Sequence, residues 1–142
     1  MSKRIFALII IVGIVSVITI SCSEDETTTA PPANSTSAPF AKFSELQVKV
    51  FNNCLGAQCH SSSANQGNLT LEAGVSFNNL VGVQSALFPQ FKRVEPGNST
   101  NSLLIKILKG EVSPRMPLNG SPLTAATIDS VARWIDQGAL NN

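Results

Sequence analysis

The chain has 142 residues, of which ten are Lys or Arg and nine are Asp or Glu, and its formal net charge is +1. This length is too short for two large domains, and the scattered basic residues do not form the clustered basic face that is typical of nucleic-acid-binding proteins. The chain has one histidine and no tyrosine, so we expect neither an enzyme with its own acid–base set nor a small-molecule substrate.

The N-terminal residues follow the pattern of an export signal. Two basic residues precede an apolar run of 16 residues, 5–20, which is slightly shorter than the about 17–25 residues of a membrane-spanning helix. The small residue Ser21 then precedes Cys22, a pattern that resembles the cleavage site of bacterial lipoprotein signals. We therefore expect residues 1–21 to be a lipoprotein signal peptide and Cys22 to carry the lipid, with an uncleaved transmembrane anchor as the alternative.

Residues 22–39 are rich in Ser, Thr and Pro and begin with an acidic stretch, so they lack the apolar surface needed to fold. We expect a lipid-anchored, disordered linker here, followed by one folded domain over residues 40–142. The acidic residues 24–26 resemble the surface-export signal of some Gram-negative lipoproteins, although a solvated linker end explains them equally well. The N-terminal part thus predicts an exported protein, held by its lipid on the periplasmic or cell-surface side of a Gram-negative outer membrane.

The first helix of the folded domain is predicted at residues 45–53. Ser44 and Gln47 have the spacing of a capping box, and apolar residues follow them at helical spacing. The polar residues 61–68 then predict a loop. Residues 69–94 are apolar without a clean period, which predicts short helices and loops.

Two further helices are predicted in the second half of the domain. A turn at residues 95–98 precedes a helix at residues 102–109, which Gly110 should end. A proline-containing loop at residues 112–121 leads to a last helix at residues 125–137. This helix has Thr124 as its N-cap, an apolar stripe of Ile128, Val131, Ala132 and Ile135, and Gly138 at its end. No stretch alternates convincingly as a strand would, so the sequence predicts an all-α domain.

Cys54, Cys59 and His60 form the motif C-x4-C-H. Two thiols can add to the two vinyl groups of a haem, and a histidine beside the second cysteine is placed to bind the iron. The usual motif has two residues between the cysteines, whereas this chain has four. Gly56 and Ala57 make it sterically easy for such a longer loop to bulge outward. Taken alone, the motif permits a covalent haem c without being specific for it.

A second candidate ligand lies about half a domain downstream. Met116 is the one methionine after the signal-like N-terminus, and it stands between Arg115 and Pro117 in the predicted loop. Core packing is the ordinary role of a methionine, but a polar loop is a poor place for it. A thioether suits the sixth position of low-spin iron, and His/Met ligation raises the reduction potential because it favours Fe(II). The residues therefore favour a haem iron held by His60 and Met116.

Six short motifs stand in an order and at spacings that resemble one known family. They are, in chain order, F-N-N-C-L-G-A-Q-C-H, L-T-L, R-V-E-P-G-N-S-T-N-S-L-L, R-M-P-L, P-L-T and W-I-D-Q-G-A. Over residues 47–140 the chain is similar to small single-haem cytochrome c domains of the planctomycete-like type, in which a four-residue gap between the cysteines also occurs. The resemblance implies a cytochrome c-like helical fold, with haem bound covalently to Cys54 and Cys59 and axially to His60 and Met116.

The remaining matched residues are expected to be structural. Trp134 should pack the last helix onto the first helix or onto the edge of the haem. Arg93 and Arg115 are the candidates for pairing with a haem propionate, because a guanidinium group suits a carboxylate in two-point contact. An ordinary solvated arginine is the alternative for each.

The predicted function is the passage of single electrons to or from a redox partner protein. With both axial positions filled, the iron would not bind a substrate, and the protein would set the potential through its pocket and ligands. A haem enzyme is one alternative, but it would need an open sixth position and usually a further acid–base group. A non-redox surface lipoprotein with a Cys54–Cys59 disulfide is the other, since disulfides form in exported proteins. Zinc lacks an obvious fourth ligand in this motif.

Overall fold

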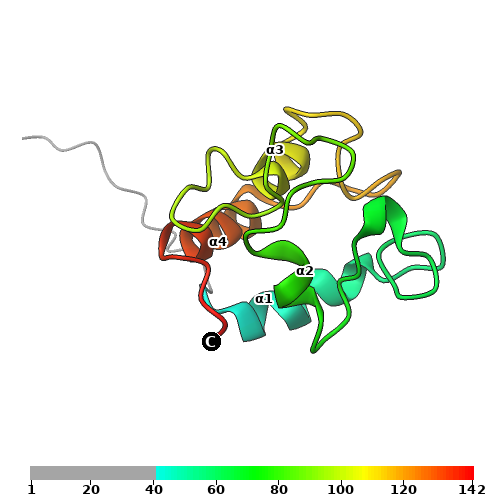
Figure 1. The fold of residues 1–142 in the computed structure, drawn as a ribbon, viewed down its shortest axis with the longest axis horizontal. Helices are drawn as coiled ribbons and strands as arrows, with labels where there is room; N and C mark the ends of the chain where they lie inside the picture. The colour runs from blue at the N-terminus through cyan, green and yellow to red at the C-terminus, as the bar shows by residue number, and fades with distance from the viewer. Residues whose placement is uncertain (1–40) are drawn as a thin grey trace, which may run out of the picture. The chain divides into compact units, whose positions relative to one another are not determined.

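The computed structural model describes residues 41–142. Within this range it contains four α-helices and two short 3-10 helices, η1 and η2 (Figure 1). Their bounds are Phe43–Lys49 (α1), Phe51–Cys54 (η1), Gln66–Asn68 (η2), Ser76–Leu80 (α2), Leu103–Lys109 (α3) and Ala125–Asp136 (α4). The same residues form no named strand, only isolated bridges between Val81 and Val94 and between Gln84 and Lys92. The prediction of a mainly helical domain is therefore confirmed.

The predicted signal peptide (residues 1–21), the predicted lipidation site Cys22 and the predicted linker (residues 22–39) lie outside the described residues. The same holds for residue 40, where the folded domain was predicted to begin. Among residues 41–142, no helix combines the length and the apolar character needed to cross a membrane.

The first helix differs from its prediction at both ends. α1 ends at Lys49, and Val50, with φ −119° and ψ −63°, separates it from the 3-10 turn η1. At the start, Lys42 rather than Ser44 occupies the N-cap position, and it makes no capping side-chain hydrogen bond. The predicted capping box is therefore wrong, because Gln47 lies in the second half of α1 and turns its amide into the core.

Asn142 caps α1 from the other end of the described chain. Its Oδ1 accepts the N–H of Phe43 at 2.9 Å, and its backbone oxygen accepts the N–H of Ser44 at 2.9 Å. The first N–H groups of a helix have no partner within the helix, so these two bonds do what the capping box would have done. No local sequence pattern indicates this contact, because Phe43 and Asn142 are 99 residues apart.

Gln47 is the centre of a buried polar network beneath α1. Its Nε2 donates to the Leu71 carbonyl at 2.9 Å and to Asn52 Oδ1 at 2.8 Å, and its Oε1 accepts from the Ser76 hydroxyl. The network joins α1 to η1, to the segment before α2 and to α2 itself. Since buried polar groups need partners, these bonds fix how the short elements pack against one another.

The two later helices agree with their predictions. α3 begins after Ser102 and is ended by Gly110, whose φ of +79° suits a glycine. α4 begins after Thr124, whose Oγ1 accepts the N–H of Thr127 at 3.2 Å. The predicted apolar stripe is confirmed, since its members are buried or pack against the core: Ile128, Val131, Ala132 and Ile135.

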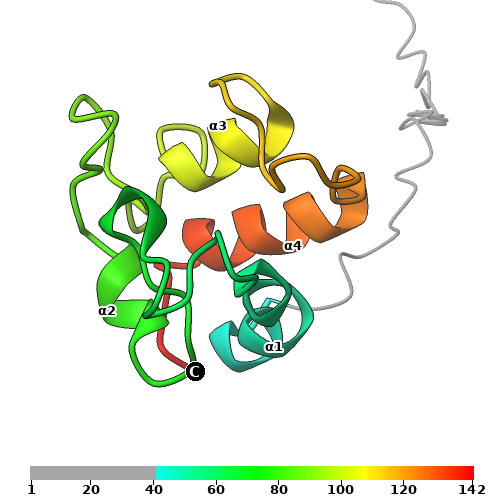
Figure 2. The same ribbon diagram turned by 90° about the vertical axis from the view of Figure 1, so that its right-hand side faces the viewer.

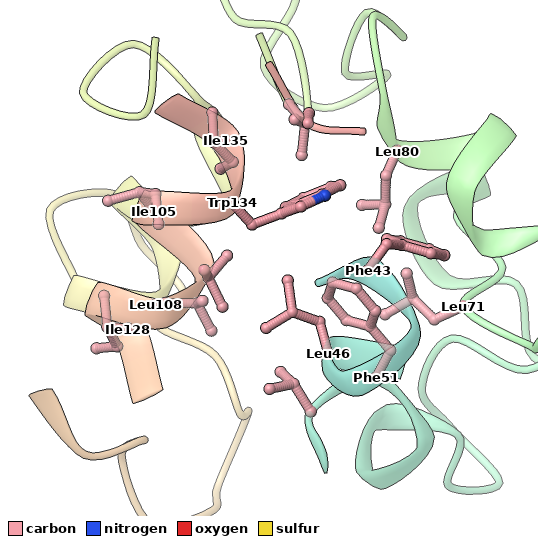
Figure 3. Packing of buried hydrophobic residues seen from close by; sticks show 14 residues of the cluster. Phe43, Leu46, Phe51, Leu71, Leu80, Ile105, Leu108, Ile128, Trp134 and Ile135 are labelled. Carbon is pink, nitrogen blue, oxygen red and sulfur yellow. The ribbon is translucent and has the colours of Figure 1, made fainter. Parts of the chain in front are cut away.

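α4 is the central helix of the described domain, with α3 on one side and α1 on the other (Figure 2). The Trp134 side chain points from α4 toward α1 (Figure 3), and the centre of its ring lies 5.4 Å from that of Phe43. The indole N–H is satisfied, because it donates to the Leu140 carbonyl at 2.8 Å. Trp134 therefore packs the last helix onto the first, which is one of its two predicted positions.

The Asn142 cap gives a test of this arrangement. Asn142→Ala removes the side-chain acceptor of the Phe43 N–H, so we expect the free energy of unfolding to fall by about 0.5–2 kcal/mol, the range for a lost N-cap. Urea unfolding followed by circular dichroism measures the change. Asn141→Ala is the matched control, because Asn141 is exposed and its loss should change stability by less than about 0.5 kcal/mol. Equal losses in the two variants would contradict the capping role.

Candidate functional site

A cavity of about 490 Å³ lies against the hydrophobic core. Its volume is within the roughly 300–1,000 Å³ that is typical of small-molecule and cofactor pockets. Most of its wall is apolar, and α3 alone contributes Leu103, Leu104, Ile107 and Leu108. Several buried core residues also belong to the wall, namely Val50, Phe51, Leu71, Leu80 and Leu108. The cavity therefore opens at the surface, where Leu87 and Leu118 line it, and its inner wall is formed by residues of the core.

The four predicted haem-binding residues all line this cavity. They are Cys54, Cys59, His60 and Met116. The first three come from η1 and the loop that follows it, whereas Met116 comes from the loop after α3. The fold thus brings two thiols, an imidazole and a thioether from two distant segments to a single apolar pocket.

Cys54 and Cys59 stand at the two ends of a compact loop. The His60 N–H donates to the Cys54 carbonyl at 3.0 Å, and the Cys59 N–H donates to the Gly56 carbonyl at 2.9 Å. A Cβ added at Gly56 would lie 3.2 Å from the Cys59 sulfur, so the glycine allows this close approach. The four-residue spacing is therefore accommodated by a folded loop that keeps both cysteines at the cavity wall.

Both cysteines carry free thiols in the structure. The Cys54 thiol donates to the Val50 carbonyl oxygen, which lies 3.5 Å from Sγ. Burial raises the pKa of the Cys54 thiol above its ordinary value, and the neighbouring Cys59 raises it further. The Cys54 sulfur is therefore held as a neutral thiol at neutral pH.

The His60 ring is held by a backbone carbonyl. Its Nδ1 lies 3.1 Å from the carbonyl oxygen of Gln66. Since a carbonyl oxygen only accepts, we assign the proton to Nδ1, which leaves the lone pair of Nε2 free to bind a metal. The backbone of His60 is fixed as well, because its carbonyl accepts the Leu71 N–H at 2.7 Å. With the proton assigned to Nδ1, the His60 ring would offer Nε2 to a metal.

The Gln66 carbonyl reaches the imidazole because the residues around it adopt left-handed backbone conformations. The φ angle is +45° at Asn65, +66° at Gly67 and +55° at Asn68. Asn and Gly enter this region more readily than other residues. The polar residues 61–68 predicted only a loop here, although the run N-Q-G-N is a signal for a left-handed turn.

Arg93 is buried at the cavity wall and is only 8% exposed. Its guanidinium donates to three backbone carbonyls, those of Asn79 at 2.7 Å, Gly67 at 3.0 Å and Asn68 at 2.8 Å. The alternative of a solvated arginine is therefore wrong for Arg93. Arg115, the other candidate for a propionate contact, is exposed and does not belong to the wall. The carbonyl contacts of Arg93 were not predicted, since a backbone acceptor has no residue-type signature in the sequence.

Met116 is positioned by α3. Its N–H donates to the carbonyl of Ile107, in the last turn of that helix, at 3.1 Å. The side chain is partly buried and packs against the core where the cavity begins. Met116 therefore fulfils the core-packing alternative in part, and it also lines the cavity.

No family model, curated protein or solved structure matches this chain. Within residues 41–142, no group of three or more His, Cys, Asp or Glu side chains is placed to hold a metal ion. A covalently attached haem needs a different set, namely two thiols, an imidazole with a free Nε2, a soft sixth ligand and an apolar enclosure. The residues that line the cavity provide each of these groups, so they fit a haem c.

Protein produced without a cofactor offers a test of the Cys54 environment. A raised pKa means that the thiolate forms only at higher pH, so alkylation of Cys54 by iodoacetamide should accelerate at a higher pH than in an unfolded peptide. Mass spectrometry of the Cys54 peptide gives the pH profile of labelling. The same protein in urea is the control, and there the profile should centre on about pH 8.5, the ordinary value for cysteine. Identical profiles with and without urea would show that Cys54 is not buried.

Proposed function

We propose that this chain is a monohaem c-type cytochrome that transfers single electrons and is not an enzyme. The observation that carries the proposal is that Cys54, Cys59, His60 and Met116 line one apolar cavity. His60 is the only histidine of the chain, and Met116 is one of its two methionines. The convergence of both with the two cysteines at a cofactor-sized cavity would be an unusual coincidence if they had unrelated roles.

The two cysteines are proposed to attach the cofactor. Each S–H would add across one vinyl group, with the sulfur bonding to one carbon and the hydrogen going to the other, so that a thioether bond remains. The loop from Cys54 to Cys59 is closed by backbone hydrogen bonds, and both of its cysteines line the cavity. Gly56 supports this role because a larger residue would press on the Cys59 sulfur.

When bound, haem supplies an iron that changes between Fe(III) and Fe(II) by one electron. His60 would donate its Nε2 lone pair to this iron, with the ring kept in place by the bond from Nδ1 to the Gln66 carbonyl. Met116 would donate its sulfur, a soft ligand that favours Fe(II) and so raises the reduction potential. The apolar side chains of α3 would exclude water from the pocket. If His60 and Met116 both bound the iron, the site would suit electron transfer rather than substrate binding.

The N-terminal sequence extends the proposal to location. Lipidation at Cys22 would anchor the domain to the outer membrane of a Gram-negative bacterium, on its periplasmic or cell-surface side, with residues 22–39 as a tether. The partner is then a redox protein that reaches this membrane face. The cytochrome c-like fold belongs to the same proposal and is supported by the helical architecture around the cavity.

Expression in a host competent for cytochrome c assembly tests covalent attachment. The purified protein should show the absorption bands of low-spin haem c and keep a haem stain on a denaturing gel, because thioether bonds survive denaturation. The double variant Cys54→Ala, Cys59→Ala should lose the stain, whereas Gln58→Ala, between the two cysteines, should keep it. Colourless wild-type protein with a Cys54–Cys59 disulfide would refute the proposal and favour the surface-lipoprotein alternative.

Substitution of Met116 tests the sixth ligand. Met116→Ala should lower the reduction potential by roughly 0.1 V or more, since the axial ligands set haem potentials over about 0.8 V. A spectroscopic redox titration measures this change. Leu118→Ala is the matched control, because Leu118 belongs to the same loop and the same cavity wall but has no donor atom. An unaltered potential in Met116→Ala would exclude Met116 as a ligand.

A further inference from the structure

Arg93 is a buried cation without an acidic partner among residues 41–142. The ion pairs in that range are Lys92–Glu95 and Lys106–Glu111, and neither involves Arg93. Burial lowers the pKa of the guanidinium, which still keeps its proton at neutral pH. Since a buried charge is costly unless its donors are paired, the three backbone carbonyls take the place of a counter-ion.

Two of these carbonyls belong to the loop that holds the imidazole. Gly67 and Asn68 directly follow Gln66, and both accept from the same nitrogen of Arg93, Nη2, at 3.0 Å and 2.8 Å. The third carbonyl, that of Asn79, lies in α2 and accepts from Nη1 at 2.7 Å. The guanidinium therefore ties the loop to a helix that packs into the core.

We propose that Arg93 is a positioning residue for the His60 ligand, because it clamps residues 65–68 so that the Gln66 carbonyl stays on His60 Nδ1. The loop needs such a clamp, since three of its four residues have left-handed φ angles and its 3-10 turn is only three residues long. Lysine would not replace arginine here, because a point donor lacks the planar fork that reaches several acceptors at once. The role at the iron rests on the proposed function, whereas the clamp itself concerns only the protein.

Arg93 would have two separable effects on a haem iron, one through the hydrogen bonds of the clamp and one through its positive charge. A carbonyl that accepts from Nδ1 fixes the ring and makes the imidazole a stronger donor, which favours Fe(III). A buried positive charge at the cavity wall acts in the opposite direction, because it disfavours the more positive state of the iron. Arg93→Lys keeps the charge and loses the fork, whereas Arg93→Met loses both. The reduction potential of Arg93→Met should therefore lie below that of Arg93→Lys.

The test compares the haem-loaded wild type with Arg93→Lys, Arg93→Met and the control Lys92→Met. Lys92→Met removes the same unit charge one residue away, at a side chain that is 42% exposed and so screened by water. In both Arg93 variants, the backbone amides of residues 65–71 should exchange hydrogen roughly tenfold faster or more, because bonds to a charged donor are lost. The electron paramagnetic resonance spectrum of the oxidised form should also change, since the imidazole turns. Lys92→Met should alter neither property.

The positioning role would be overturned if, in Arg93→Lys, the amides of residues 65–71 exchanged hydrogen at the wild-type rate and the resonance spectrum were unchanged. If Arg93→Met does not fold, the result for Arg93→Lys decides the test. Faster exchange spread evenly over residues 41–142 would overturn it as well, because that result indicates a general loss of stability. Colourless wild-type protein would end the proposed function instead. The exchange comparison in the cofactor-free protein would then still confirm or refute the clamp.

Discussion

An apolar pocket lies beside the hydrophobic core of this domain and shares several of its residues. Protein interiors pack at a density of about 0.74–0.76, whereas here an open, mostly apolar pocket of about 490 Å³ lies directly against the core. Its wall includes Phe51, Leu80 and Leu108, which are also buried core residues. An apolar occupant would therefore complete the core, and one that binds only the folded chain would stabilise the fold by mass action.

Tertiary contacts rather than helix propensity hold the wall of this cavity in place. α1, α2 and α3 have 7, 5 and 7 residues, whereas isolated helices shorter than about 12–15 residues are marginal in water. Gln47 connects α1 to Leu71, whose N–H donates to the His60 carbonyl. Arg93 connects α2 to the loop whose Gln66 carbonyl lies beside the His60 ring. In our proposal, the orientation of the imidazole therefore depends on two buried polar side chains that act through backbone hydrogen bonds.

The sequence predicted α3 and α4 because their caps and apolar stripes are local features. The grouping of Cys54, Cys59, His60 and Met116 was predicted for another reason, since histidine and methionine are rare in this chain and few sites combine them with two cysteines. The capping box failed because the Gln47 amide pairs instead with Leu71 and Ser76, which are 24 and 29 residues away. The contacts of Arg93 were hidden for the same reason, because its loop acceptors are backbone atoms 25 and 26 residues earlier.

The hydrogen bonds from Phe43 and Ser44 to Asn142 place the beginning of the first helix and the last residue that the structure describes beside each other. None of these three residues belongs to the cavity wall. Domains whose ends meet tolerate circular permutation and insertion into other proteins. The described domain is therefore suited to insertion into a loop of another protein, or to circular permutation with new termini in an exposed loop. Neither change would alter a residue of the cavity wall.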